Sequence, residues 1–335
     1  MRDTIGRWQA TRMLTGRLAV ICCITAMGVV GACARKTPPP PTRQPGALAS
    51  PAHQFDHVIV VVLENEDAAR VDAVPAMDSL ARRGTALRNY NAVAHPSYPN
   101  YLALISGHTF IDSDRRVRHD PEAYRALDIG DAQLRIDAPT IVDRLEVRAL
   151  SWDVFAEDYP ELGVAPSRCD FRRQLGLYAR KHLPFLSFES FHTHPEQCVH
   201  VRNLRWFRPD SLASYTYIEP NLVHDGHNAP LDSAVTWLGR FLEPLLADSA
   251  LMRNTLIVVT FDEASNSLTS NLFGSGSNRI YTVLLGGMVQ PGMSSDVAYS
   301  HYSLLRTIEV NFGLSPSLVA RDVVPVGDVW RSRRQ

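Results

Sequence analysis

The sequence predicts an α/β protein with a mostly parallel central sheet and helices on both faces of that sheet. Segments with the marks of strands alternate with helix-like segments over most of the chain, which is typical of parallel sheets whose strands are joined by helices. The run DHVIVVVL at 56–63 is continuously apolar and rich in valine, as expected of a strand that is covered on both faces. Several helix-like segments close with glycine, a common stop signal.

The individual elements follow these patterns in order. The helix expected at 75–84 has Pro75 at its start and Gly84 at its stop, and the helix expected at 97–107 has Pro99 in its first turn. The expected strands are 56–63, 85–93, 150–156, 214–219, 254–262 and 279–287. The expected helices are 75–84, 97–107, 138–147, 171–182, 229–248 and 301–313.

The composition is that of a globular protein with a sizeable core. Of the 335 residues, 45% are hydrophobic and 21% are charged, which excludes a chain that is disordered throughout. The formal net charge is -1 at pH 7, and nothing in the charge pattern indicates a nucleic-acid partner. No linker marks off a second domain, so residues 55–335 are expected to form one domain.

The first 32 residues have the pattern of an export signal. Two arginines precede an apolar stretch of about 15 residues, the length of a signal-peptide core and short for a membrane span. The sequence VGAC, which ends at Cys33, is similar to a bacterial lipobox, so lipidation of Cys33 and a membrane-anchored lipoprotein are expected. A plain signal peptide cut after Ala32 or Ala34 is the alternative. Residues 33–54, rich in proline and alanine, are expected to form an extended tether.

Two of the five cysteines lie within the expected signal and a third is Cys33, which leaves Cys169 and Cys198. In an oxidising compartment such a pair predicts a disulfide. Two free buried thiols are the alternative.

Polar residues follow directly after the expected strands, where the ligands of parallel α/β sheets bind. Glu64 and Asn65 follow the first strand, and the strand expected at 254–262 ends with Asp262, which Glu263 follows directly. Carboxylate and amide oxygens are hard ligands, so these four residues are candidates to hold one divalent metal ion of unknown identity. Acidic residues at strand ends are also common as caps and turn formers, which is the alternative for each pair.

The segment HPSYPN at 95–100 places one serine between two prolines at the start of an expected helix. Ser97 could simply cap the helix. A helix start also favours a bound phosphate, and a nearby metal would lower the pKa of the Ser97 hydroxyl, so Ser97 is the candidate nucleophile. His95 and Asn100 lie in the same segment and are candidates for binding the substrate phosphate.

Three further histidines follow a strand or open a helix. His224 and His227 are spaced i, i+3 around a glycine in HDGHN, and His301 opens the last expected helix. Such histidines could neutralise a phosphate, and one could protonate a leaving oxygen as general acid. Zinc ligation and a purely structural role are the alternatives for His224 and His227.

Other catalytic signatures are absent from the sequence. It contains no G-x-S-x-G, no G-x-x-x-x-G-K-[ST], no H-E-x-x-H and no C-x-x-C. This argues against an esterase of the usual α/β kind, a nucleotide triphosphatase and a zincin protease.

With these residues collected, the chain resembles the phosphoesterase family that joins secreted bacterial and fungal acid phosphatases to phospholipase C type enzymes, within the alkaline phosphatase superfamily. The resemblance covers nearly all of residues 55–315. It is carried in order by VVVLEN, NAVAHPSYPNYLALISG, LSWDVFAEDYP, YARKHLPF, YIEPNLVHDGHN, LGRFLEPLL, TLIVVTFDEA, YTVLLGGMVQPG and SHYSLLRTIEVNFGL.

The resemblance implies an alkaline phosphatase-like fold and assigns the same residues to the same chemistry. It implies a metal bound by the LEN and FDE motifs, Ser97 as the nucleophile, and the four histidines at 95, 224, 227 and 301 around the phosphate. The chain departs from the family's pattern at Glu66 and Asp67, after the LEN motif, and at Asn228, where relatives similar to the compact acid phosphatases carry aspartate.

The function expected from the residues and from the resemblance is an acid phosphatase that hydrolyses phosphate monoesters through a metal-assisted phosphoserine intermediate. The alternatives are a phospholipase C-like phosphodiesterase, a phosphatase of phosphoinositide or other lipid head groups, and a non-catalytic lipoprotein that binds phosphate groups. The expected substrate is a phosphorylated small molecule or lipid, and no protein partner is predicted. The expected location is the periplasm or cell surface, with membrane contact through the lipid anchor.

Overall fold

The computed structural model describes residues 53–110, 135–160, 168–265, 278–317 and 320–331. The expected signal peptide, the lipidation site Cys33 and the tether lie outside the described residues. All described residues belong to one compact unit, Pro45–Gln335. Among them, no helix is both long and apolar enough to cross a membrane.

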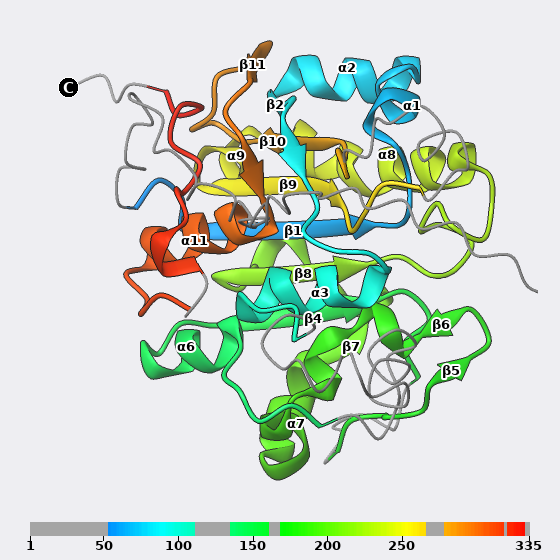
Figure 1. Ribbon diagram of the computed structural model, residues 1–335, viewed down its shortest axis with the longest axis vertical. Helices are drawn as coiled ribbons and strands as arrows, with labels where there is room; N and C mark the ends of the chain where they lie inside the picture. Colours follow the sequence, from blue (N-terminus) through cyan, green and yellow to red (C-terminus); the bar gives the residue numbers. More distant parts are fainter. Residues whose placement is uncertain (1–52, 111–134, 161–167, 266–277, 318–319, 332–335) are drawn as a thin grey trace, which may run out of the picture. The chain divides into compact units, whose positions relative to one another are not determined.

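The core of this unit is an eight-stranded sheet with the strand order β11-β2-β10-β9-β1-β8-β4-β7 (Figure 1). The five adjacent strands from β9 to β7 are mutually parallel, β10 runs antiparallel to both of its neighbours, and β11 is parallel to β2. The strands are β1 (His57–Leu63), β2 (Thr85–Leu87), β4 (Trp152–Ala156), β7 (Val201–Asn203), β8 (Tyr215–Glu219), β9 (Thr255–Phe261), β10 (Thr282–Leu285) and β11 (Met293–Ser295). The prediction of a mostly parallel sheet is therefore confirmed.

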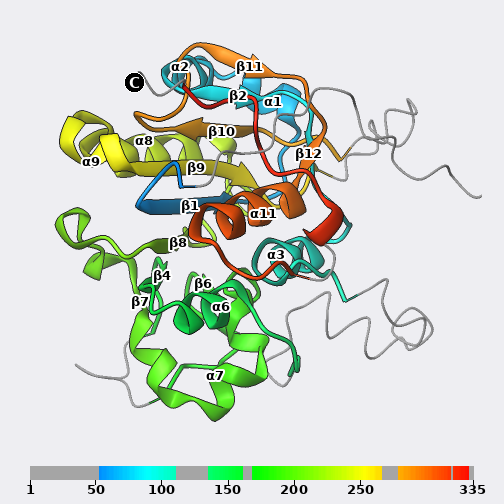
Figure 2. The ribbon, with the colours of Figure 1, turned by 90° about the vertical axis from the view of Figure 1, so that its left-hand side faces the viewer.

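Helices cover both faces of the sheet. Figure 1 shows α3 (Ser97–Ser106), α6 (Ile141–Val147) and α11 (His301–Phe312) in front of it, and α8 (Leu231–Ala247) and α9 (Ser249–Asn254) behind it; Figure 2 shows the same layers from the side. The other helices are α1 (Ala68–Asp72), α2 (Pro75–Arg83) and α7 (Glu189–Thr193), with short 3-10 turns between them. The middle strands β1 and β9 are buried along almost their whole length, as their continuous apolar sequences predict.

The sequence prediction was wrong in two places. Residues 171–182, expected to be a helix, form a small hairpin of β5 (Gln174–Leu175) and β6 (Tyr178–Ala179), followed by a 3-10 turn. Gly176 lies at the hairpin turn with a φ of 59°, in the left-handed region that a glycine adopts without steric cost and a continuing helix does not allow. Turn geometry therefore overrode the helix-like spacing of the apolar residues.

The second error concerns residues 85–93, which were expected to be one strand. They form β2 in the main sheet and β3 (Tyr90–Asn91), which pairs with β12 (Tyr299–Ser300) in a separate two-stranded sheet. The backbone of Arg88 bonds to Ser295 and that of Asn89 to Tyr299, so the chain changes partner between the two strands. This change directs the following segment, with Ser97, toward the carboxyl ends of the parallel strands.

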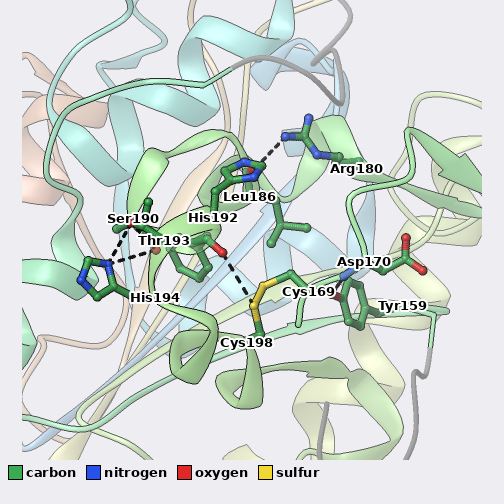
Figure 3. Close-up of a disulfide and its surroundings, with 11 residues drawn as sticks. Tyr159, Cys169, Asp170, Arg180, Leu186, Ser190, His192, Thr193, His194 and Cys198 are labelled. Carbon is green, nitrogen blue, oxygen red and sulfur yellow. Dashed lines mark hydrogen bonds between the residues drawn. A yellow bond between two sulfur atoms is a disulfide. The ribbon is translucent and has the colours of Figure 1, made fainter. Parts of the chain in front are cut away.

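Cys169 and Cys198 form a disulfide (Figure 3). The bridge links the chain just before the β5–β6 hairpin to the 3-10 helix Pro195–His200. Both sulfur-bearing residues are buried, and the carboxylate of Asp170 next to the bridge accepts four hydrogen bonds from Arg172, one of them from the backbone N–H. The base of the hairpin is thus covalently and electrostatically anchored.

Candidate active site

Two carboxylates meet where β1 and β9 end side by side. The two strands pair in parallel up to Leu63 and Phe261, so the next residues, Glu64 and Asp262, are neighbours across the sheet. The backbone N–H of Asp262 donates to the carbonyl of Leu63 at 2.8 Å, which extends the pairing by one step. Both side chains are fully buried.

Asn65 turns the chain at this point so that two of its groups reach functional neighbours. Its φ of 50° is in the left-handed region, which asparagine tolerates better than most residues. In this conformation its backbone N–H donates to Oδ1 of Asp262 at 3.0 Å, while its side-chain Oδ1 accepts from the Ser97 hydroxyl at 3.2 Å. An unusual backbone conformation at a cluster of polar groups is typical of functional sites.

The Ser97 hydroxyl lies between the two strand ends. It donates to Oε1 of Glu263 at 2.9 Å, and Oε2 of the same carboxylate pairs with Nδ1 of His95. Ser97 is the first residue of α3, whereas Pro96 occupies the N-cap position, and no side chain caps the helix. The capping role that the sequence left open for Ser97 is therefore not the one its side chain performs.

Two asparagines hold the loop that carries Ser97. The amide of Asn100 accepts from the backbone N–H groups of Val93 and Ala94 at 2.9 Å and donates to the carbonyls of Ala94 and Pro96. These four bonds use all the hydrogen-bonding capacity of a fully buried amide, so none remains for a substrate phosphate. Asn100 thus fixes the loop, in place of the phosphate-binding role expected from the sequence.

Asn278 joins this loop to the segment after Glu263. Its Nδ2 donates to the carbonyl of Ala94 at 2.7 Å, and its Oδ1 accepts from the backbone N–H of Ala264 at 2.9 Å. Its own backbone carbonyl accepts from Ala92 at 2.8 Å. One side chain therefore sets the spacing between the segment that carries Ser97 and the segment that carries Glu263.

Glu64 also belongs to a second polar cluster, with His182 and Asp225. One ligand atom each of Glu64, His182 and Asp225 lie within 4.8 Å of one another, and all three residues are buried. Nε2 of His182 is 2.9 Å from Oε1 of Glu64, and its Nδ1 is 3.5 Å from Oε1 of Glu219. The ring stacks on Tyr101, with 5.5 Å between the ring centroids. These contacts fix the orientation of the imidazole.

The electrostatics of this cluster favour a cation. Burial favours the neutral form of Glu64, but His182 and Lys181 outweigh it and lower the pKa of Glu64 to about 2. Burial, together with the charges of Glu64 and Glu263, raises the pKa of Asp262 well above its usual range. Two adjacent buried carboxylates with opposed shifts are the pattern that a bound cation relieves, because its charge favours the ionised form of both.

The unpartnered atoms agree with this interpretation. Among the described residues, buried atoms without a hydrogen-bond partner include both carboxylate oxygens of Glu64, Oδ2 of Asp225, Oδ2 of Asp262 and Nε2 of His182. Nε2 of His182 and Oε1 of Glu64 lie close together without hydrogen-bond geometry, as two ligands of one ion do. Buried polar atoms are otherwise almost always paired. Carboxylate oxygens and an imidazole nitrogen are a suitable donor set, so this buried cluster could hold a metal ion.

The structure separates the predicted histidines. His95 contacts Glu263, and His227, which is exposed and pairs with Asn228, is close enough to Glu64 to help lower the pKa of that carboxyl. Nδ1 of His224 is 2.8 Å from Glu157, and the ring stacks on Trp237.

His301 contacts the backbone at the end of β9. Its Nε2 is 2.6 Å from the backbone carbonyl of Asp262, its Nδ1 is 3.2 Å from the hydroxyl of Tyr90, and the side chain is fully buried. Burial lowers the pKa of His301 to about 4, so the ring is neutral near neutrality. This neutral ring supports the backbone of Asp262 and is not the phosphate-facing cation that the sequence suggested.

Sequence reasoning did not single out two residues of the buried cluster. His182 lies in YARKHLPF, in the segment expected to be helical, and Asp225 lies between the two histidines of HDGHN that drew attention. Asp225 was detectable as a third carboxylate at a strand end. Gly226 follows it with a φ of 103°, and a Cβ there would lie 3.1 Å from the carbonyl oxygen of Glu64. The glycine therefore lets this loop approach the end of β1.

The departures from the family pattern fall beside this site. Glu66 is buried and accepts two hydrogen bonds from Arg70, at 2.7 and 2.8 Å, and Asp67 accepts one from Ser265 at 2.9 Å. Both acidic side chains are thus used within the loop.

Comparisons with known proteins show the family to which the chain belongs. The sequence matches the Phosphoesterase family over residues 67–315. It is 30% identical over 269 residues to a probable acid phosphatase of Kluyveromyces lactis, and the match covers 78% of this chain and 59% of the relative. It is 31% identical over 272 residues to a phosphate-repressible acid phosphatase of Penicillium chrysogenum, and this match covers 79% of this chain and 60% of the relative. The chain thus spans about three fifths of the length of these fungal relatives.

Two further matches concern length and fold. A phosphatidylinositol-3-phosphatase of Mycobacterium tuberculosis is 31% identical over 293 residues, which cover 86% of this chain and 87% of the relative. The fold is similar to that of an alkaline phosphatase superfamily protein from Vibrio parahaemolyticus, with a TM-score of 0.51 at 12% identity over 84% of this chain and 70% of that one. With a family match over most of its length and a relative matched nearly end to end, the chain belongs to the Phosphoesterase family.

Proposed function

We propose that the protein is a phosphatase that hydrolyses phosphate monoesters with Ser97 as the nucleophile. The observation that carries this proposal is the position of the Ser97 hydroxyl, which reaches Glu263 at 2.9 Å and Asn65 at 3.2 Å at the start of α3. A hydroxyl held between a carboxylate and an amide at a helix N-terminus can act on a bound phosphate.

The proposed reaction has two steps. Ser97 Oγ attacks phosphorus in line with the ester oxygen, its proton passes to Glu263, and the P–O bond to the alcohol breaks as a proton reaches the departing oxygen. Water then attacks the phosphoserine, which releases inorganic phosphate and returns the proton to Ser97. The paired His95 keeps the Glu263 carboxylate oriented. The exposed His227 is a candidate for protonating the leaving oxygen, and His224 for a supporting role.

The site also fits one divalent metal ion. Glu64, Asn65 and Asp262 would hold it, with Glu263 at the edge, because Glu64 and Asp262 supply the unpartnered oxygens at the strand ends. Bound there, such an ion would stabilise negative charge on the phosphoryl oxygens. His182 and Asp225 are further candidate ligands of this ion, because one ligand atom of each lies within 4.8 Å of one of Glu64.

A phosphatase of lipid head groups is the second candidate. It is favoured by the Mycobacterium tuberculosis relative, which this chain matches over nearly its full length, whereas the fungal acid phosphatases are longer. A phospholipase C-like diesterase is the third candidate. A comparison of turnover on a monoester and a diester of the same phenol distinguishes the first two candidates from the third.

Export to an oxidising compartment remains part of the proposal. The Cys169–Cys198 disulfide supports it, because such bridges persist outside the reducing cytosol. Signal cleavage and the lipid anchor at Cys33 remain predictions from the sequence.

The test is hydrolysis of an aryl phosphate by the parent protein, Ser97→Ala and Ser106→Ala. Ser106 is a matched control because it is a buried serine of the same helix whose hydroxyl bonds only to nearby backbone groups. We expect Ser97→Ala to lose at least about a thousandfold in kcat and Ser106→Ala to stay near the parent. Equal rates for Ser97→Ala and the parent would exclude Ser97 as nucleophile. Added chelator should abolish turnover, and readdition of a divalent cation should restore it.

A further inference from the structure

The β5–β6 hairpin exposes apolar side chains beside the candidate active site. Leu175 and Leu177 flank the turn glycine and are 44% and 43% exposed. The carbonyl of Leu177 accepts from the backbone N–H of Leu222 at 3.0 Å, which brings the 37% exposed Val223 next to the hairpin. Three of the seven large apolar side chains exposed among the described residues therefore gather here.

The same segment is strongly basic. Residues 168–181 contain five cationic side chains and one acidic one, although the whole chain has a net charge of -1. Arg168, Arg172 and Arg173 are exposed, and the single acid, Asp170, is buried against Arg172. We call residues 168–179 the cationic hairpin. Its surface combines aliphatic groups at the tip with positive charge at the base.

The cationic hairpin is continuous with the active site. Strand β6 leads directly into the turn Arg180–His182, where Lys181 lies 3.5 Å from Glu64 and His182 joins the buried cluster. Val223 immediately precedes His224 on the other side of the hairpin. A surface that the hairpin contacts would therefore lie close to the segments that carry Lys181 and His224.

The base of the hairpin is held in place by a disulfide and by hydrogen bonds. The Cys169–Cys198 disulfide fixes the chain before it, and the backbone N–H of Asp170 donates to the hydroxyl oxygen of Tyr159 at 2.9 Å (Figure 3). The N–H of Arg180 donates to the carbonyl of Arg173 at 3.0 Å and closes the ladder. In Figure 1 β5 and β6 lie apart from the main sheet at the lower right. An anchored base and an exposed tip suit an element that inserts into another phase.

We propose that the cationic hairpin, together with Val223, docks the protein on an anionic membrane surface and presents the site to phosphate monoesters carried by lipid head groups. Aliphatic side chains enter the interface while arginines contact the lipid phosphates, with about fivefold in affinity for each arginine near the surface. The proposal deepens the phosphatase assignment and depends on it for the substrate, but docking itself does not require catalysis.

The catalytic test compares two substrates and two variants. The full-length parent, Leu175→Asp/Leu177→Asp and the control Val147→Asp are assayed on a soluble aryl phosphate and on vesicles of phosphatidylcholine, phosphatidylserine and phosphatidic acid. Val147 is 86% exposed at the end of α6, outside the hairpin. We expect the double variant to lose at least about tenfold in kcat/KM on vesicles, while it stays within about twofold on the soluble ester, and the control to match the parent on both.

A docking test without catalysis separates failure of this inference from failure of the proposed function. Leu175→Trp and Val147→Trp are mixed with phosphatidylcholine–phosphatidylserine vesicles that contain brominated lipid, and quenching is compared with that of the parent. Added quenching in Leu175→Trp alone, which weakens with rising salt, is expected. Equal quenching at both positions would overturn the proposal, and so would unchanged kcat/KM on vesicles in the double variant. Binding of the hairpin to a soluble protein but to no vesicle would also overturn it.

Discussion

Removal of the Asn278 side chain tests whether the spacing between the Ser97 and Glu263 segments matters for chemistry. Asn278→Ala deletes one bond to the carbonyl of Ala94 and one from the N–H of Ala264. Each side-chain hydrogen bond contributes roughly 1 kcal/mol, and the abandoned Ala264 N–H adds a cost of similar size. We therefore expect the free energy of unfolding to fall by about 2–3 kcal/mol.

The effect on turnover follows from the contact between Ser97 and Glu263, whose spacing the Asn278 side chain maintains. Ser97 and Glu263 are 2.9 Å apart, and a shift of about 1 Å between their segments would break that bond. A displacement of this size costs up to about a hundredfold in rate. We expect kcat on an aryl phosphate to fall about ten- to a hundredfold with little change in KM, because the substrate contacts themselves are not removed.

Asn311 offers the matched control. Its amide also joins backbone groups of a distant segment, with Oδ1 accepting from Gln54 at 2.6 Å and from Phe55 at 3.2 Å, and Nδ2 donating to the Phe55 carbonyl at 2.8 Å. Asn311→Ala should lose at least as much stability as Asn278→Ala and keep kcat. In a Ser97→Ala background, Asn278→Ala should lower the residual rate no further. Equal losses of kcat in the two asparagine variants, or full additivity with Ser97→Ala, would refute a positioning role for Asn278.

Three other predictions address the scaffold. Gly226→Ala should lower the free energy of unfolding by about 1–3 kcal/mol, because an alanine is strained at a φ of 103°. Gly239 has open space around it inside α8, so Gly239→Ala should raise the free energy of unfolding by about 1 kcal/mol. Urea unfolding measures both changes. Burial lowers the pKa of His301 to about 4, below its unfolded value near 6.5, so the stabilising effect of its neutral ring is complete above pH 6.5 and lost as the pH falls through 4. The loss should reach about 3 kcal/mol, and a His301→Gln variant with an unchanged slope between pH 6.5 and 4 would contradict it. Cys169→Ser/Cys198→Ser should lower stability by about 3 kcal/mol, because the bridge closes a separation of 29 residues, and equal melting of oxidised and reduced parent would argue otherwise.

The sequence was sufficient for the middle strands of the sheet and for the residues at their ends, because both depend on local patterns, whereas the short strands β7 and β11 at the two edges were not predicted. Continuous apolar runs predicted β1 and β9, and parallel pairing then required Glu64 and Asp262 to be neighbours. The contact of Ser97 with Glu263 depends on a loop of only a few residues after β3, which the Pro-bracketed segment indicated.

Long-range contacts were beyond the sequence patterns. His182 reaches Glu64 because residues 171–182 fold as a hairpin, and nothing in their apolar spacing distinguishes that hairpin from a helix. The role of Asn100 depends on which backbone groups surround its amide, and the neutral state of His301 depends on complete burial under Asp262. Such environments are formed by tertiary packing, so the residue type alone did not predict them.

The most direct test of the central claim is to identify the residue that carries the phosphoryl group during turnover. The parent protein is mixed with excess aryl phosphate, quenched in acid within one turnover, digested and analysed by mass spectrometry, with Ser97→Ala and Ser106→Ala treated in parallel. We expect a phosphoserine at Ser97 in the parent and in Ser106→Ala, and none in Ser97→Ala. A phosphoryl group on a histidine, or rapid turnover with no covalent intermediate on Ser97, would contradict the proposed chemistry.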